Sequence, residues 1–317
     1  PGPCGGRVMA LRHDIRRGAL CMLAAHLLFT CMSAMVKALG DRIPFIEVMF
    51  FRNALAVPVV MAIALRRARR LGDIAAQLRT RRFPGHLLRA CTGTMAMLCS
   101  FFALTVLPLA EQTALTYTTP LFVTILSIPF LGERVGIHRW SAVLVGFAGI
   151  LIIAFGKGAF QGGAAMPPLV QLGVVVAVLH GVFSAGTTLL VRQLSATESS
   201  TTIVLWQSLL MTAFTALALP FVWVAPGWED VLLILGIGMV GGIGQVLLTE
   251  AYASAQVSAL GPYSYSSILW SVALGWMIWG EAPTLAMLAG AVLIVAAGLY
   301  ILHREMVWAR RRRGQSQ

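Results

Sequence analysis

The chain has 317 residues, of which 58% are hydrophobic and 11% are charged, and its mean hydropathy is +0.82. Soluble domains carry about 25% charged residues, so this composition excludes an ordinary soluble protein and indicates a membrane protein. The formal net charge of +12 would by itself suit a nucleic-acid partner, but its distribution along the chain favours contact with lipid headgroups and a role in membrane topology.

Hydrophobic stretches long enough to cross a bilayer recur along the chain between short polar breaks. One helical span needs about 17 to 25 apolar residues. The stretches are continuous rather than alternating, which favours a helical bundle over a β-barrel. The sequence therefore predicts an all-α integral membrane protein with ten transmembrane helices, over residues 18–39, 44–65, 85–107, 111–131, 140–156, 169–191, 201–224, 231–253, 261–280 and 285–302.

The basic residues fall mostly on one side of this predicted bundle. They gather in the N-terminal tail (1–17), between the second and third spans, and in the C-terminal tail (304–317), whereas the loops of the opposite side contain only Arg42 and Lys157. Because positive loops stay inside, both termini of this multi-pass membrane protein are expected in the cytoplasm.

Two ionisable side chains belong to the first predicted span. His26 lies inside the span, where an ionisable residue is costly and suggests a function. A neutral histidine bonded to a nearby carbonyl is the alternative, and both interpretations remain open. Lys37 stands at the trailing end of the helix, where a cation meets the negative end of the helix dipole, so a snorkelling end-cap is expected rather than a coupling charge.

Arg52 lies in the second span with no compensating acid beside it. The predicted topology puts it about eight residues, or roughly 12 Å, below the outer surface. A charge at the centre of a span costs roughly 2.5 to 3.5 kcal/mol on insertion scales, so Arg52 should face the bundle and find an acceptor. Freed carbonyl groups, Glu111 or a substrate carboxylate would serve, and a structural clamp is favoured over direct binding.

Four residues of the fourth span recur at intervals of three and four, which places Thr113, Tyr117, Pro120 and Thr124 on one face of that span. Pro120 removes a backbone donor in mid-membrane, which predicts a helix break and frees carbonyl groups that need another partner. For Thr113 and Thr124, helix packing and cavity lining are equally compatible with the pattern. For Tyr117 a cavity wall is favoured, because an aromatic wall suits a planar organic substrate.

The sixth span holds His180 and, four residues later, Ser184 on the same helix face. His180 invites the same two interpretations as His26. Together with Ser184 it also suggests an intramembrane hydrolase as a rival function. However, Val182 stands where the G-x-S-x-G motif needs its first glycine, so no catalytic residue is expected and the chain is not predicted to be an enzyme.

The eighth and ninth spans contain further candidates. Glu250, near the inner end of the eighth span, could couple protons or pair with an arginine of the inner face. The stretch GIGMVGG at 236–242 has the spacing of a dinucleotide-binding motif but lies inside a span, so it predicts a close contact between helices. In the ninth span, Pro262 predicts a second helix break, and Tyr265 and Trp270 are expected to line a cavity.

The second half of the chain resembles the first. VKAL at 36–39 matches VRQL at 191–194, which makes Lys37 equivalent to Arg192, and FFRNAL at 50–55 matches LWQSLL at 205–210, which pairs Arg52 with Gln207. Further on, LGERV and WGEAP align through Glu133 and Glu281, and AVLVGFAGI at 142–150 aligns with AVLIVAAGL at 291–299. Each copy holds five spans, an odd number, so the second must enter the membrane from the opposite side.

This inverted repeat organises the whole chain. The predicted parts are a basic tail (1–17), a first five-helix repeat (18–156), a periplasmic linker (157–168), a second five-helix repeat (169–303) and a second basic tail (304–317). Inverted repeats are usual in secondary transporters, where two related halves expose one central site to either face in turn.

The stretches TPLFVTILSIPFLGERVGIHRWSAVLVGFAGILI and SYSSILWSVALGWMIWGEAPTLAMLAGAVLIVAAGLYIL resemble the paired signatures of the drug/metabolite transporter superfamily, in its EamA-type ten-helix group. FIEVMFFRN, HLLRACTG and HRWSAVLVGFAGI are most similar to bacterial carriers of the S-adenosylmethionine-uptake type, and related sequences include riboflavin and amino-acid carriers. The resemblance implies a central cavity lined chiefly by spans one, three, four, six, eight and nine.

The sequence thus predicts a secondary transporter that moves a small organic metabolite across the inner membrane by alternating access. A specific uptake carrier for a cofactor such as S-adenosylmethionine or riboflavin is the alternative to a carrier that exports amino acids or metabolites. The expected partners are a small-molecule substrate and the lipid bilayer, without nucleic acid, and a homodimer is compatible with the sequence. No cofactor is expected, nor a metal, since the cysteines show no paired metal spacing.

Overall fold

A computed structural model of the chain describes residues 15–40, 42–67, 80, 82–131, 137–156, 167–194, 197–198, 200–254 and 263–314. Within these ranges the regular structure is helical throughout, which confirms that the chain is all-α, as predicted. The helices are α1 (Ile15–Leu39), α2 (Phe45–Arg67), α4 (Phe83–Val106), α5 (Leu109–Thr116), α6 (Thr119–Leu131), α7 (Ile137–Gly156), α8 (Pro168–Leu194), α9 (Ser200–Val222), α10 (Trp228–Ser254), α12 (Ser266–Trp279) and α13 (Leu285–Gly314).

Six of the described helices are long and apolar enough to cross a membrane: α1, α2, α4, α8, α9 and α10. Shorter apolar segments lie in α7, α12 and α13. Each of the ten predicted spans coincides with a helix, apart from the fourth, which the structure divides into two. The protein is therefore a multi-pass helical membrane protein.

The fourth predicted span is not one continuous helix, because α5 ends at Thr116 and α6 begins at Thr119 after a turn. Pro120 has no N–H to donate to the carbonyl group of Thr116, and the hydroxyl of Thr119 donates to that carbonyl instead, at 2.9 Å. The turn residue Thr118 donates from both its N–H and its hydroxyl to the carbonyl of Leu115, at 3.1 and 2.8 Å. The predicted common face therefore does not exist across the break.

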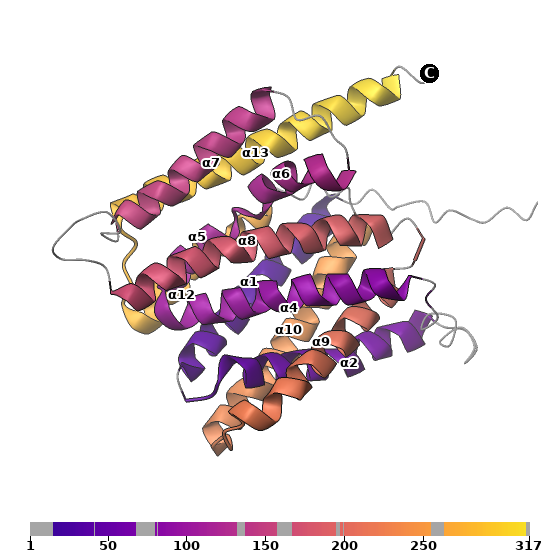
Figure 1. Ribbon diagram of the computed structural model, residues 1–317, viewed down its shortest axis with the longest axis vertical. Helices are drawn as coiled ribbons and strands as arrows, with labels where there is room; N and C mark the ends of the chain where they lie inside the picture. Colours follow the sequence, from indigo (N-terminus) through magenta and orange to yellow (C-terminus); the bar gives the residue numbers. More distant parts are fainter. Residues whose placement is uncertain are drawn as a thin grey trace, which may run out of the picture.

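The helices pack in pairs that join the two halves of the chain. The principal contacts are α1 with α10, α4 with α8, α2 with α9, and α7 with α13. In the internal repeat, α1 corresponds to α8, α4 to α10, α2 to α9 and α7 to α13. Replacing each helix by its counterpart therefore converts the α1–α10 pair into the α8–α4 pair and leaves the other two pairs unchanged, as expected for a duplicated five-span unit. Figure 1 shows the α7–α13 pair at one edge of the bundle and the α2–α9 pair at the other, with α4 and α8 between them.

Small residues let several of these helices approach closely. A Cβ atom on Gly149 of α7 would meet the backbone carbonyl of Gly290 of α13, at 2.7 Å. In α10, Gly238 and Gly242 face Leu55 and Val59 of α2, and Gly241 faces Met32 of α1. The glycine-rich stretch at 236–242 is therefore a helix contact, as predicted from its place inside a span.

Candidate functional site

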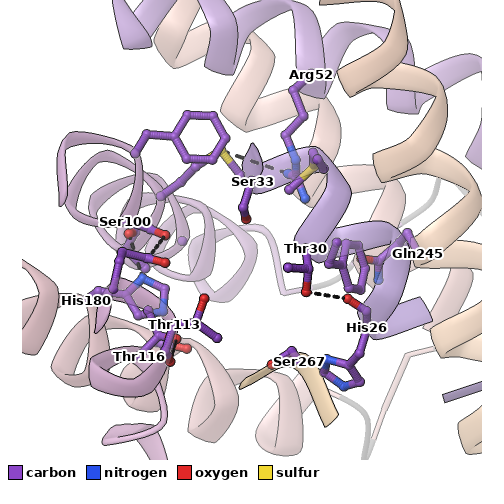
Figure 2. A pocket seen from close by; sticks show the side chains of 18 of the residues that line it. His26, Thr30, Ser33, Arg52, Ser100, Thr113, Thr116, His180, Gln245 and Ser267 are labelled. Atoms are coloured by element: carbon purple, nitrogen blue, oxygen red, sulfur yellow. Dashed lines mark hydrogen bonds between the residues drawn. The ribbon is translucent and has the colours of Figure 1, made fainter. Parts of the chain in front are cut away.

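A cavity of about 480 Å³ lies within the bundle. Its walls come from α1, α4, α5 with the following turn, α8, α10 and α12, which correspond to spans one, three, four, six, eight and nine. One residue each from α2 and α9, Arg52 and Gln207, completes the described lining. Figure 2 shows the labelled side chains arranged around the open space, with His180, Ser100 and Thr113 facing Thr30 and Gln245 across it. The cavity thus lies between the two halves of the chain.

Threonine hydroxyls on the wall are held by their own helices. Thr30 donates to the carbonyl of His26 at 2.8 Å, Thr113 to that of Leu109 at 2.8 Å, and Thr116 to that of Thr113 at 2.7 Å. Each hydroxyl oxygen keeps lone pairs that can accept a further hydrogen bond from a ligand or water. The wall therefore presents hydroxyl oxygens whose orientation is already fixed, so a ligand can donate a hydrogen bond to them with little loss of side-chain entropy.

The two intramembrane histidines both line the cavity but are held differently. His180 places its Nδ1 2.8 Å from the carbonyl oxygen of Ala96, so Nδ1 is the donor and Nε2 is the acceptor in the neutral ring. The ring of His26 packs edge-on against Phe29, with 6.3 Å between centroids, and makes no hydrogen bond to the described residues. His180 is thus fixed by the backbone, whereas His26 presents ring nitrogens that can bind a ligand.

Arg52 reaches the cavity from α2. Its Nη1 lies 3.3 Å from Oδ1 of Asn53 and 3.9 Å from Sδ of Met97, and its buried Nε has no partner among the described residues. Glu111 is not among its partners, and the nearby acid in sequence, Glu47, accepts from the N–H of Val224 instead, at 3.1 Å. The acceptors expected within the chain therefore do not neutralise the guanidinium group.

Lys37 is not a snorkelling end-cap. Its ammonium group forms an ion pair with Glu281, donates to the carbonyl of Leu107 at 3.1 Å, and lies 5.0 Å from the ring centroid of Trp279. The other carboxylate oxygen of Glu281 accepts from the N–H of Leu109 at 3.1 Å. These contacts join α1 and the α4–α5 turn to the end of α12, because burial at this position makes a partner more favourable than solvent. The side chain of Arg192, the equivalent residue, lies outside the described part of the structure.

The tyrosines of the two repeats meet where the turn after α5 approaches the start of α12. The rings of Tyr117 and Tyr265 lie 4.8 Å apart. The Tyr117 hydroxyl donates to the carbonyl of Ser264 and lies 2.6 Å from Oγ of Ser267. Tyr117 lines the cavity, whereas Tyr265 turns its hydroxyl toward Gly298 of α13. The contact therefore connects the α5–α6 turn of the first half to the start of α12 in the second half.

The remaining predicted residues lie elsewhere. Thr124 is buried and donates to the carbonyl of Pro120 at 3.1 Å, away from the cavity lining. Trp270 is also outside the lining, and its indole N–H is buried without a partner among the described residues. Pro120 lies at the α5–α6 break. Pro262 and the side chain of Glu250 are outside the described part of the chain.

Several lining residues were not singled out from the sequence. Gln112 and Gln245 are amides inside apolar spans, a signal that could have identified them, and Gln112 donates to Ser100 at 2.9 Å. Ser33 and Ser267 carry no such signal, because small hydroxyl residues are equally common at helix contacts.

The cavity wall contains the serine and the histidine of the rival hydrolase interpretation. Ser184 and His180 both line the cavity, but the histidine bonds the Ala96 carbonyl and the described residues supply no serine–histidine hydrogen bond or orienting carboxylate. Nor do the described residues contain a cluster of three histidine, cysteine or acidic side chains that could hold a metal ion.

Comparisons with known proteins agree with this arrangement. The EamA-like transporter family model matches residues 16–155 and 171–303. The pseudopaline exporter of Pseudomonas aeruginosa is 31% identical over 89% of this chain and 95% of its own. The riboflavin transporter of Vibrio cholerae is 32% identical, over 96% and 99%. The S-adenosylmethionine uptake transporter of Rickettsia bellii is 27% identical, over 86% and 88%. A solved crystal structure with 22% identity shares the fold, with a TM-score of 0.63 over 93% of this chain and 98% of that chain.

Proposed function

Because the chain belongs to the EamA-like transporter family and so transports small molecules, we propose that it is a secondary carrier that works by alternating access in the inner membrane. The observation that carries this proposal is the polar cavity between the two halves of the chain, which both repeats line. Rocking of one half against the other would expose such a cavity to each face of the membrane in turn.

The interrupted fourth span supports the same mechanism. Helices broken near the middle of the bilayer are typical of transporter binding sites, since irregular backbone is tolerated there only where it is buried or lines a cavity. In this chain the α5–α6 break brings Tyr117 to the cavity wall and against Tyr265 at the start of α12 in the second repeat. A substrate bound at this contact would touch both moving halves.

The substrate is a polar organic metabolite of about the size of a cofactor fragment. A volume of about 480 Å³ is typical of small-molecule sites, and the described lining sets hydroxyl, amide and imidazole groups from both halves among apolar side chains. The relatives include a pseudopaline exporter, a riboflavin transporter and an S-adenosylmethionine uptake transporter. A cofactor-type uptake carrier and a metabolite exporter are therefore both retained as candidate functions.

Uptake into proteoliposomes tests the proposal. The full chain would be reconstituted and given labelled riboflavin, S-adenosylmethionine, and aromatic and aliphatic amino acids, with and without an imposed pH gradient. Saturable uptake of one compound is expected, with a loss of about tenfold or more in His26→Ala and Tyr117→Phe, which alter the wall. Thr188→Val is the control, because Thr188 lies on the outside of α8 and bonds only its own helix. Folded protein that moves none of these compounds, yet hydrolyses esters in a Ser184-dependent way, would instead support an enzyme.

A further inference from the structure

Arg52 brings a full positive charge to the cavity wall without an ion-pair partner among the described residues. Its contacts within the chain are an amide oxygen at 3.3 Å and a thioether sulfur at 3.9 Å, both at the long end of hydrogen-bonding distance. Its Nε is buried and unpartnered. The guanidinium group carries five N–H donors, so most of its hydrogen-bonding capacity is left for whatever enters the cavity.

Two other cations among the described residues are paired with acids, whereas Arg89, buried outside the cavity lining, donates to the carbonyl of Ile203 at 3.4 Å. Lys37 is paired with Glu281, and Arg42 lies 3.3 Å from Asp230. Arg52 is buried more deeply than Arg42, yet among the described residues no carboxylate lines the cavity beside it. A buried charge is retained at such a cost where it serves a function, and the natural partner of a guanidinium group is a carboxylate.

The surroundings of Arg52 hold it toward the cavity. Gly241 of α10 leaves the space that the Arg52 stem occupies, since a Cβ atom there would lie 3.9 Å from both Cγ and Nε of the arginine and 2.9 Å from the sulfur of Met32. Figure 2 shows Arg52 entering from one side of the cavity while Ser267 and His26 lie on the opposite side. The charged group and the hydroxyl- and imidazole-bearing wall thus form two different ends of one site.

The equivalent position of the second repeat indicates that the repeated fold does not itself require a positive charge at this place. Gln207 also lines the cavity, and its amide donates to the sulfur of Met211 at 3.4 Å. The fold therefore accommodates a neutral amide at this place in the bundle. A positive charge is needed in only one half, which is what an asymmetric ligand with one anionic group requires.

We propose that Arg52 binds a carboxylate of the transported molecule, so that the substrate is an organic acid or a zwitterion rather than a neutral or purely cationic compound. This proposal rests on the function proposed above. The planar guanidinium group would hold the carboxylate through two parallel N–H donors, and the opposite wall would contact the polar body of the molecule.

Matched pairs of acids and amides test this directly by binding. The purified full chain in detergent would be titrated with nicotinate and nicotinamide, indole-3-acetate and indole-3-acetamide, and L-tryptophan and L-tryptophanamide, with binding measured by microscale thermophoresis. Riboflavin and riboflavin 5′-phosphate would be added to separate a carboxylate site from a phosphate site. The proteins would be the wild type, Arg52→Gln, Arg52→Lys and the control Arg42→Gln, which removes an arginine outside the cavity.

The wild type is expected to bind at least one acid about tenfold or more tightly than its amide, which corresponds to about 1.4 kcal/mol. Arg52→Gln should abolish that preference, Arg52→Lys should retain part of it because lysine keeps the charge but not the fork, and Arg42→Gln should leave it unchanged. The thermal midpoint of each variant would confirm that the protein remains folded, since Arg52→Gln copies the residue of the other repeat.

Three results would overturn the proposal: acids and amides bound equally or not at all, a preference that survives in Arg52→Gln, or a preference for the phosphate ester alone. These are distinct from failure of the carrier function. Acid-selective binding without flux in proteoliposomes would support carboxylate binding at Arg52 but contradict the proposed carrier function. Flux that does not depend on Arg52 would support the carrier function but contradict carboxylate binding at Arg52.

Discussion

Lys37 illustrates how a single charge can connect distant parts of the chain. Its ammonium group contacts Glu281, the carbonyl of Leu107 and the face of Trp279, while the same carboxylate also accepts from a backbone N–H in the α4–α5 turn. The side chains of the ion pair are only 12% and 23% exposed, so water does little to replace either partner. Removing one charge leaves the other without adequate solvation.

Lys37→Met is therefore expected to lower the free energy of unfolding by about 1 to 3 kcal/mol, the range for hydrogen bonds to partly buried charged groups. The matched control is Arg42→Met, whose guanidinium side chain is 51% exposed and whose ion pair should contribute about 0.5 kcal/mol or less. Thermal unfolding in detergent would compare them, and the double variant with Glu281→Gln should lose less than the sum of the single changes. Equal losses at Lys37 and Arg42 would contradict this account.

The helix break between α5 and α6 depends on an absent side chain in a neighbouring helix. Gly181 of α8 faces Thr118 in the turn and the ring of Phe122 at 3.1 Å, so a Cβ atom at this position would collide with both. One and a half turns further along α8, Gly186 has only the methyl group of Thr92 near it, at an ordinary contact distance of 3.8 Å. The same helix thus offers a crowded glycine and an open one.

Gly181→Ala should destabilise the protein by about 1 to 3 kcal/mol, because α8 must move away from the turn or the turn must shift. Gly186→Ala should be neutral or stabilising by up to about 1 kcal/mol, since alanine is the better helix former. The midpoint of thermal unfolding measures both, and uptake would show whether the displaced turn also impairs the cavity. If both variants behaved alike, the close approach at Gly181 would not matter.

Sequence reasoning located the helices well and their interruptions less well. Continuous apolar stretches determine where the chain enters and leaves the bilayer, so the predicted spans coincide with helices. The sequence predicts a helix break at Pro120, and α6 begins one residue earlier, at Thr119, but the three- and four-residue spacing of Thr113, Tyr117 and Thr124 assumes one helix face that continues past this break. The turn before Pro120 separates Thr124, which bonds its own helix, from Thr113 and Tyr117, which reach the cavity.

For the charged residues, the predicted topology allowed ion pairs between distant spans that an analysis of each span by itself did not consider. Lys37 and Glu281 were both expected at the outer ends of their spans, so a pairing between them was available from the predicted topology. A structural clamp is the interpretation that the sequence favours for Arg52, because the family resemblance implies a cavity lined chiefly by spans other than the second. Which side chain turns inward depends on the rotation of each helix against its neighbours, and periodicity alone does not determine this for a span that is apolar on all sides.

At the scale of the whole molecule, the pairing of helices follows the internal repeat. Each principal pair joins one helix from each half, and exchange of the halves reproduces the same set of pairs. The sequence predicts five spans in each half, an odd number, so the two halves are expected to enter the membrane in opposite directions. This prediction puts both chain termini on one side of the membrane and the loop between the halves on the other.

Cysteine labelling tests this topology. In a variant without the native cysteines, Lys157→Cys is expected to react with a membrane-impermeant maleimide added to intact cells, whereas Ser316→Cys should react only after the membrane is opened. The physical reason is the excess of arginine in the two tails and the loop between the second and third spans. Labelling of both positions from the outside would refute the inverted arrangement.

The ion pair between Lys37 and Glu281 also bears on how the protein is made. The two residues are 244 positions apart in the chain. At synthesis rates of about 5 to 20 residues per second, the lysine waits on the order of 10 to 50 s before its acid leaves the ribosome. During that interval the newly inserted first half contains a lysine whose acid has not yet been made, and extension of its side chain toward the headgroups would lower the cost of that charge. We expect the arrival of Glu281 to draw the lysine back into the bundle, so that this ion pair forms late in the assembly of the two halves.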